Sequence, residues 1–284
     1  MVQVPLSARR RISVFCIRDL ADVTNGHLRL STMPPLDGDL HLINRLVFDS
    51  RKVQPGDVFW ALSGPQFDGA QFIEDALLRG ATGIVVADRM LEPWAGGFCI
   101  TVEDTRQALQ ELARWNCRRL LGEIILVLGD QSQRIAKALG DLLVTEVIPY
   151  GTPASFLGAL SCIDEFSEFA VVSIANNDPG EIGTISHLCC PRIAVISPPT
   201  KTKNTRLHEI NSPVHPHELK SVLPSGCSIF PTGDDEEVTA GTDEQAAQEM
   251  EINLASAVAR ALGLHSKRDV GSLAPVNVGR RPAA

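Results

Sequence analysis

Short apolar runs alternate along the chain with longer stretches in which apolar residues recur every three or four positions. The first kind is typical of buried β-strands, and the second is typical of amphipathic helices. Strands are predicted over residues 44–49, 58–62, 83–87, 98–102, 120–128, 169–174, 193–196 and 228–230. Helices are predicted over residues 67–79, 105–121, 136–144, 181–188, 218–223 and 244–262. The repeated strand–helix order predicts an α/β fold with mainly parallel sheets.

Two glycines mark turns in the first part of this pattern. Pro55 fixes its own φ, and Gly56 after it can take the unusual backbone angle of a tight turn between two strands. Gly80 directly follows the helical stretch over residues 67–79 and is expected to close that helix.

The connection at residues 129–135 has the flanks of a phosphate-binding loop, because a strand precedes it and a helix follows. Such loops normally carry a lysine that reaches the outer phosphates and a hydroxyl that holds Mg²⁺, while backbone N–H groups cradle the phosphate. Gly129 is present, but Gln133 stands at the lysine position, and Arg134 and Ile135 stand at the hydroxyl positions. The sequence therefore predicts the strand–turn–helix arrangement of a nucleotide-binding loop without the lysine and hydroxyl that bind the nucleotide and Mg²⁺.

Composition and charge exclude several classes of function. The 284 residues are 44% hydrophobic and 21% charged, which fits an ordinary globular protein with one or two domains. The apolar runs are too short to span a bilayer, and the basic start lacks the apolar segment of a secretory signal. A formal net charge of −8 argues against nucleic-acid binding. Seven scattered cysteines indicate reduced thiols in a cytoplasmic protein, and no metal site is predicted.

Residues 49–64 read D-S-R-K-V-Q-P-G-D-V-F-W-A-L-S-G, and residues 67–81 continue F-D-G-A-Q-F-I-E-D-A-L-L-R-G-A. This long pattern resembles the N-terminal domain of the Mur ligases, which build the peptide stem of bacterial peptidoglycan. The most similar branch is the one that adds D-alanyl-D-alanine. The N-D-P-G-E-I turn at residues 177–182 is similar to the family's N-H-P-G-E-I. The resemblance covers roughly residues 40–262.

The resemblance implies a small α/β domain that binds a uridine nucleotide, followed by a central ATPase-type domain. Ser50 and Arg51 match the positions that help to bind the uridine nucleotide in the family. Their chemistry suits this role, because an Arg fork matches phosphate and a hydroxyl can meet a sugar or diphosphate oxygen. An alternative stays open, in which Asp49 and Arg51 only tie a strand end to the turn at Pro55 and Gly56.

The residues that bind ATP and Mg²⁺ in the family are not found at the matching positions of this sequence. Gln133 replaces the lysine, and Ser173 stands where the family has its Mg²⁺-binding glutamate. Residues 197–200 read S-P-P-T in place of the family's asparagine, and no lysine lies at residues 215–217, where a second magnesium support is expected. The family's C-terminal domain is expected to be absent. No cofactor is therefore expected, although the family uses ATP and Mg²⁺.

These expectations give four segments: a flexible leader at 1–25, the N-terminal domain at 26–118, the degenerate central domain at 119–265 and a flexible tail at 266–284. The leading hypothesis is a catalytically inactive Mur-ligase-like protein that binds a UDP-N-acetylmuramoyl peptide or acts as a scaffold for other cell-wall ligases. One alternative is an active ATP-dependent ligase of the D-alanyl-D-alanine-adding branch that needs a partner subunit. The other is a purely structural or interaction protein.

Overall fold

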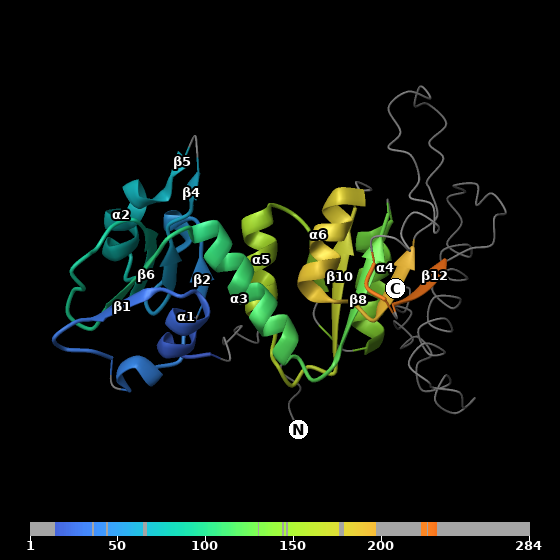
Figure 1. Ribbon diagram of the computed structural model, residues 1–284, viewed down its shortest axis with the longest axis horizontal. Helices are drawn as coiled ribbons and strands as arrows, with labels where there is room; N and C mark the ends of the chain where they lie inside the picture. Colours follow the sequence, from blue (N-terminus) through green and yellow to red (C-terminus); the bar gives the residue numbers. More distant parts are fainter. Residues whose placement is uncertain are drawn as a thin grey trace, which may run out of the picture. The chain divides into compact units, whose positions relative to one another are not determined.

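Two five-stranded sheets organise the part of the chain that the computed structural model describes (Figure 1). The described residues are 15–35, 37–43, 45–64, 67–129, 131–143, 145, 147–175, 179–196, 223–225 and 227–231. The chain divides into two compact units, which are taken one at a time. Unit 1 comprises residues 1–122, 150–168 and 188–190, and unit 2 comprises residues 123–149, 169–187 and 191–284.

The sheet of unit 1 has the strand order β1-β7-β6-β3-β2, and only β1 runs antiparallel to its neighbour. These strands are β1 (His27–Leu30), β2 (Leu46–Val47), β3 (Val58–Trp60), β6 (Gly83–Ala87) and β7 (Phe98–Val102). A separate short hairpin joins β4 (Ser63–Gly64) to β5 (Phe67–Asp68). The helices of unit 1 are α1 (Ile17–Val23), η2 (Gly38–Leu40), η3 (Ser50–Lys52), η4 (Gly69–Phe72), α2 (Ile73–Leu78), α3 (Thr105–Arg119) and α5 (Pro153–Ser161).

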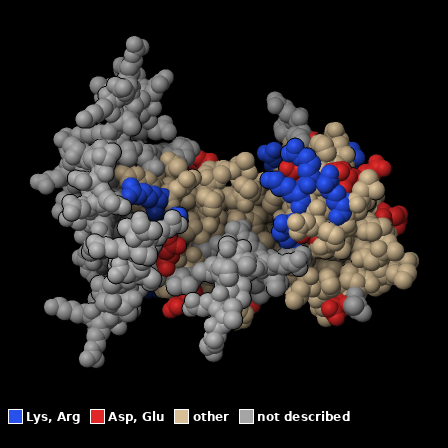
Figure 2. All heavy atoms as spheres, turned by 180° about the vertical axis from the view of Figure 1, so that it is seen from behind, with Lys and Arg blue, Asp and Glu red and all other residues tan. Residues whose placement is uncertain are grey.

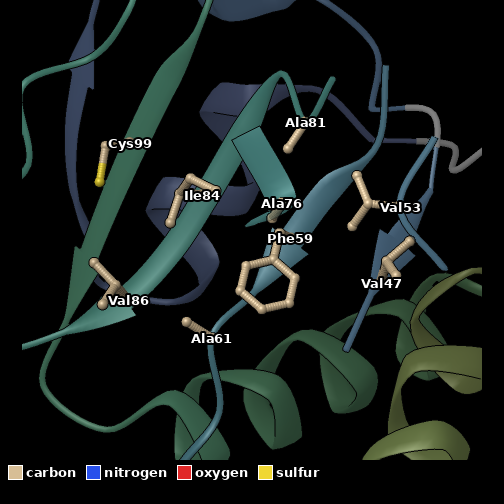
Figure 3. Close-up of a cluster of buried hydrophobic side chains, with 9 residues drawn as sticks. All are labelled: Val47, Val53, Phe59, Ala61, Ala76, Ala81, Ile84, Val86 and Cys99. Carbon is tan, nitrogen blue, oxygen red and sulfur yellow. The ribbon is translucent and has the colours of Figure 1, made fainter. Parts of the chain in front are cut away.

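The core of unit 1 lies against both faces of β3 and β6. Phe59, Ile84 and Val86 project from these strands into a cluster that also holds Ala76 of α2 (Figure 3). Alternate residues of a strand point to opposite faces, so Trp60 lies on the other side of the sheet from Phe59. Trp60 is fully buried there, and its indole Nε1 donates to the carbonyl of Thr105 at 2.9 Å. This bond satisfies the one polar group of the ring.

The sheet of unit 2 is parallel throughout, in the order β12-β11-β8-β10-β9. Its strands are β8 (Glu123–Leu128), β9 (Val147–Pro149), β10 (Phe169–Ile174), β11 (Ile193–Ile196) and β12 (Ser228–Pro231). The helices are α4 (Ser132–Leu143) and α6 (Pro179–Cys189). Ile135, Ala136 and Leu139 of α4 pack on Val127 of β8 and Val171 of β10. Burial on both faces explains why these strands are continuous apolar runs.

The α/β fold with mainly parallel sheets is confirmed, and four strands have the predicted bounds: β6, β7, β10 and β11. The helix predicted over residues 67–79 is wrong in its first half, because residues 67–68 pair with the hairpin strand β4 and Asp68 then caps η4. The strand predicted over residues 44–49 is limited to β2, and that predicted from residue 120 begins at Glu123. The predicted helix at 244–262 and nearly all of that at 218–223 lie outside the described residues.

The elements that were not predicted include α1, β1, β9 and α5. Each is short, so its apolar residues complete too few repeats to define a period. Ile17 and Leu20 of α1 are fully buried, although the sequence placed them in a flexible leader. None of the described helices combines the length and apolar character that a membrane crossing needs.

Candidate functional site in unit 1 and the turn after β8

The D-S-R element forms a turn between β2 and β3. Asp49 ends the extended segment and caps η3, because its Oδ1 accepts the backbone N–H of Arg51 at 3.2 Å. Further along the chain, Gly56 has φ +92°, and the backbone N–H of Asp57 donates to the carbonyl of Gln54 at 3.1 Å. The predicted tight turn is therefore present, and it returns the chain into β3.

Arg51 lies at the surface with its guanidinium forked on Asp49. Its Nε donates to Asp49 Oδ1 at 2.9 Å, and its Nη2 donates to Oδ2 at 2.9 Å. This side-chain hydrogen bonding lowers the pKa of Asp49 to about 2. The Arg51 side chain is nevertheless 80% exposed, and Nη1 has no hydrogen-bond partner among the described residues. The fork is thus held on one edge and open on the other.

Ser50 is buried, unlike Arg51, with 5% of its surface exposed. Interaction with the Ser50 hydroxyl is the main reason why the pKa of Asp75, on α2, is lowered. Asp75 Oδ1 also accepts from Nε of Arg79 at 3.1 Å, and Arg79 Nη1 approaches the Arg51 carbonyl at 3.5 Å. Asp75 of α2 and Arg79, which directly follows this helix, therefore contact the η3 turn.

Basic side chains surround this turn. Arg45 forms a two-pronged pair with buried Asp57, at 3.1 Å from Nε and 2.6 Å from Nη2, and Nη2 also donates to the Lys52 carbonyl at 3.1 Å. Figure 2 shows Lys and Arg side chains gathered on one face of unit 1, with carboxylates among them. Arg45, Arg51 and Arg79 each pair with a carboxylate, and part of each side chain stays exposed.

In unit 2, the turn after β8 has glycine at its bend. Gly129 has φ +102°, a region that disfavours every residue with a side chain, and its N–H donates to the Ile174 carbonyl at 3.1 Å. The N–H of Ser132 donates to the Gly129 carbonyl at 2.9 Å, where α4 begins. Gln133 and Arg134 are exposed in the first turn of α4. The predicted positions are therefore at the helix N-terminus, where backbone N–H groups are unpaired.

Two buried hydroxyls lie near this turn. Ser173 pairs in register with Val127, and because Val171 packs against α4, Ser173 two residues later faces the same side of the sheet. Ser132 is the first residue of α4. Both side chains are almost completely buried, and neither hydroxyl has a hydrogen-bond partner within the described part of the chain.

Comparisons with known proteins bear on both places. A family model described as "Mur ligase family, catalytic domain" matches residues 42–116. The chain is 30% identical over 168 residues to a UDP-N-acetylmuramoyl-tripeptide--D-alanyl-D-alanine ligase of Treponema pallidum, covering 53% of this chain and 36% of that protein. It is 30% identical over 198 residues to the ligase of the same name from Synechocystis, covering 66% of this chain and 41% of that protein.

The fold agrees with these matches. A structure of the UDP-N-acetylmuramoylalanyl-D-glutamyl-2,6-diaminopimelate--D-alanyl-D-alanyl ligase from Acinetobacter baumannii aligns with a TM-score of 0.68 and 18% identity, over 94% of this chain and 69% of that one. The chain is a Mur ligase relative. It matches well under half of the length of the two curated ligases.

ATP and Mg²⁺, which the Mur ligase resemblance implies, do not fit the described residues of the turn. A Mg²⁺ ion prefers carboxylate ligands and keeps near-octahedral oxygen geometry, whereas Ser173 offers a neutral, buried hydroxyl. Gln133 carries no charge with which to meet a phosphate. Within the described ranges, no three His, Cys, Asp or Glu side chains are grouped to hold a metal ion.

Several residues of the Mur ligase resemblance lie outside the described part of the chain. These are Asn177 and Asp178 of the N-D-P-G-E-I turn, the S-P-P-T segment and the histidines around residue 215. The remainder of that turn forms the start of α6, at Pro179. Sequence reasoning also missed Asp75 and Arg79. Their four-residue spacing on a predicted helix was visible, but nothing local indicated Ser50 as a partner.

Proposed function

We propose that this Mur ligase relative is a catalytically silent protein of peptidoglycan precursor synthesis, which binds a UDP-linked muramoyl peptide through the turn that carries Arg51. The observation that carries the proposal is the contrast between the two sites. The Asp49–Arg51 turn has Arg51 in place and open to solvent, whereas Gln133 stands at the lysine position of the turn at Gly129, and Ser173 stands where a Mg²⁺-binding carboxylate is expected.

Loss of ligation follows from the charge that phosphoryl transfer has to stabilise. In the family, ATP phosphorylates a carboxylate, and cations neutralise the charge that develops on the moving group. Removing one such contact commonly costs on the order of 10³-fold in rate. Gln133 and Ser173 would remove two such contacts, one from the lysine and one from a metal ligand. Together they would leave no useful ligase activity.

Binding of an anionic precursor is supported by the open edge of Arg51. Its Nη1 group faces solvent, while Asp49 fixes the plane of the guanidinium. A planar fork of this kind is suited to a phosphate oxygen. A cytoplasmic setting is part of the proposal, because the precursor is a UDP conjugate and all seven cysteines are free thiols. The same surface would let the protein act as a scaffold for cell-wall ligases that share the precursor.

Isothermal titration of the full chain tests the proposal with two ligands, UDP-N-acetylmuramoyl-tripeptide and Mg·ATP. We expect the tripeptide to bind, no measurable heat with Mg·ATP, and no phosphate release when D-alanyl-D-alanine is added. The Arg51→Ala variant should weaken tripeptide binding roughly tenfold to a hundredfold, the range for a hydrogen bond to a charged group. Arg18→Ala, which breaks an exposed ion pair with Asp39, is the matched control.

Three results would overturn or redirect this proposal. Mg·ATP binding with phosphate release would restore the active ligase, alone or with a partner subunit. Absence of binding by either ligand would favour a structural or interaction protein. Unchanged tripeptide binding in Arg51→Ala would mean that the precursor binds elsewhere.

A further inference from the structure

Helix α2 supplies a second layer of contacts behind the η3 turn. The carboxylate of Asp75 accepts Nε of Arg79 at 3.1 Å, and its interaction with the Ser50 hydroxyl lowers the pKa of Asp75. Arg79 Nη1 lies 3.5 Å from the carbonyl of Arg51. The contacts therefore run in a ring from Ser50 through Asp75 and Arg79 to Arg51, and they join α2 to a turn 25 residues earlier in the sequence.

We infer that Asp75 is a positioning residue for the anion-binding edge of Arg51, holding η3 through Ser50 on one side and through Arg79 on the other. This inference rests on the proposed function. It assigns Asp75 and Arg79 to the site without placing either of them against the ligand.

The ring has a physical purpose because η3 is a single turn of three residues. Such a turn has poor internal hydrogen bonding and few residues to hold it. An arginine on a loose turn would have to be ordered by the ligand, at an entropic cost to affinity. Asp49 orders the guanidinium of Arg51, and the Asp75–Arg79 pair orders the backbone that carries it. The Arg51 side chain and the η3 backbone are then already ordered before the ligand binds.

A double-mutant cycle separates this role from general stability. Tripeptide affinity is measured for wild type, Asp75→Ala, Arg51→Ala and the double variant, with Asp39→Ala as the control that breaks the exposed Arg18–Asp39 pair. We expect Asp75→Ala to weaken binding about tenfold, a change of about 1.4 kcal/mol, and to have no further effect when Arg51 is already alanine. Ser50→Thr, which keeps the hydroxyl, should bind more tightly than Ser50→Ala.

A ligand-free signal accompanies the cycle. The ¹H–¹⁵N resonance of Arg51 Nε reports the ordered fork, and it should broaden or shift in Asp75→Ala but stay in place in Asp39→Ala. If wild type binds no tripeptide, the proposed function fails, and the Arg51 resonance still decides whether Asp75 holds the turn. An unchanged Arg51 resonance in folded Asp75→Ala overturns the inference. So does a tenfold loss that persists in the Arg51→Ala background.

Discussion

Arg51 extends from η3 with 80% of its side chain exposed, yet two of its nitrogens are held by Asp49. Exposed ion pairs contribute little to the free energy of folding, because water screens the charges and two side chains must be ordered. The consequence of this pair is geometric. Asp49 also caps η3 through the N–H of Arg51, so one carboxylate fixes both the backbone and the side chain of the same residue. The interpretation of these residues as a structural tie and their role as a binding element are therefore compatible.

The first prediction concerns the pKa of Asp49. Its folded pKa of about 2 lies below the ordinary value of 3.8, mainly because Arg51 donates to the carboxylate. The ionised carboxylate therefore stabilises the fold above the ordinary value, and this contribution is lost as the pH falls toward 2. Replacing Arg51 with alanine should raise the pKa of Asp49 toward 3.8. An NMR titration of the Asp49 carboxyl carbon measures the shift. Arg18→Ala should leave it unchanged, and a pKa that stays near 2 without Arg51 would contradict the assignment.

At the scale of elements, features with local causes could be predicted, and features with distant partners could not. Gly56 and Gly80 have φ values of +92° and +94°, as their positions after a proline and at a helix end indicated. Arg51 was found from its motif, but its support by Asp75 was not, because that contact depends on how α2 packs. Helix α5 is the clearest miss. It begins at Pro153 and lasts nine residues. Its apolar residues pack against α3, which lies far from it in the sequence.

Asn116 of α3 shows how α5 is held. Its Nδ2 donates at 2.9 Å to the carbonyls of both Leu160 and Ile163, at the C-terminal end of α5, where helix carbonyls have no partner within the helix. The side chain is 1% exposed. The sequence could not indicate the hydrogen-bond partners of Asn116, because both acceptors lie more than forty residues later in the chain.

The second prediction is that Asn116→Ala destabilises unit 1 by about 1–3 kcal/mol, because the Ile163 carbonyl loses the Asn116 donor and the Leu160 carbonyl keeps only the 3.4 Å bond from the Ile163 N–H. Urea unfolding followed by tryptophan fluorescence measures the change, since Trp115 is adjacent. Arg118→Ala, an exposed substitution on the same helix, should change stability by no more than about 0.5 kcal/mol. Equal effects of the two substitutions would mean that water replaces Asn116 at the end of α5.

At the scale of the whole molecule, unit 1 is not a continuous stretch of sequence. Residues 150–168 belong to it, although β8, α4 and β9 of unit 2 precede them in the chain. The domain boundary expected at residue 118 places these residues in the second domain. A boundary read from the sequence follows the linear order of the chain, whereas a packed unit can combine separate segments. Phe156, Leu157 and Leu160 of α5 are buried in unit 1, and Phe156 also meets the ring of Tyr150 edge-on at 5.0 Å.

The third prediction is that a fragment of residues 15–122 does not fold cooperatively by itself. Burying a large apolar side chain contributes about 1.5–3 kcal/mol, so the loss of Phe156, Leu157 and Leu160 removes about 5–9 kcal/mol, and whole domains have only about 5–15 kcal/mol. Circular dichroism during urea titration should show a broad transition for the fragment. Adding a peptide of residues 150–168 should restore a sharp transition, and the same peptide with Phe156→Ala and Leu160→Ala should not. A sharp transition of the fragment alone would place the boundary of the folding unit near residue 118, because α5 would then add nothing that α3 requires.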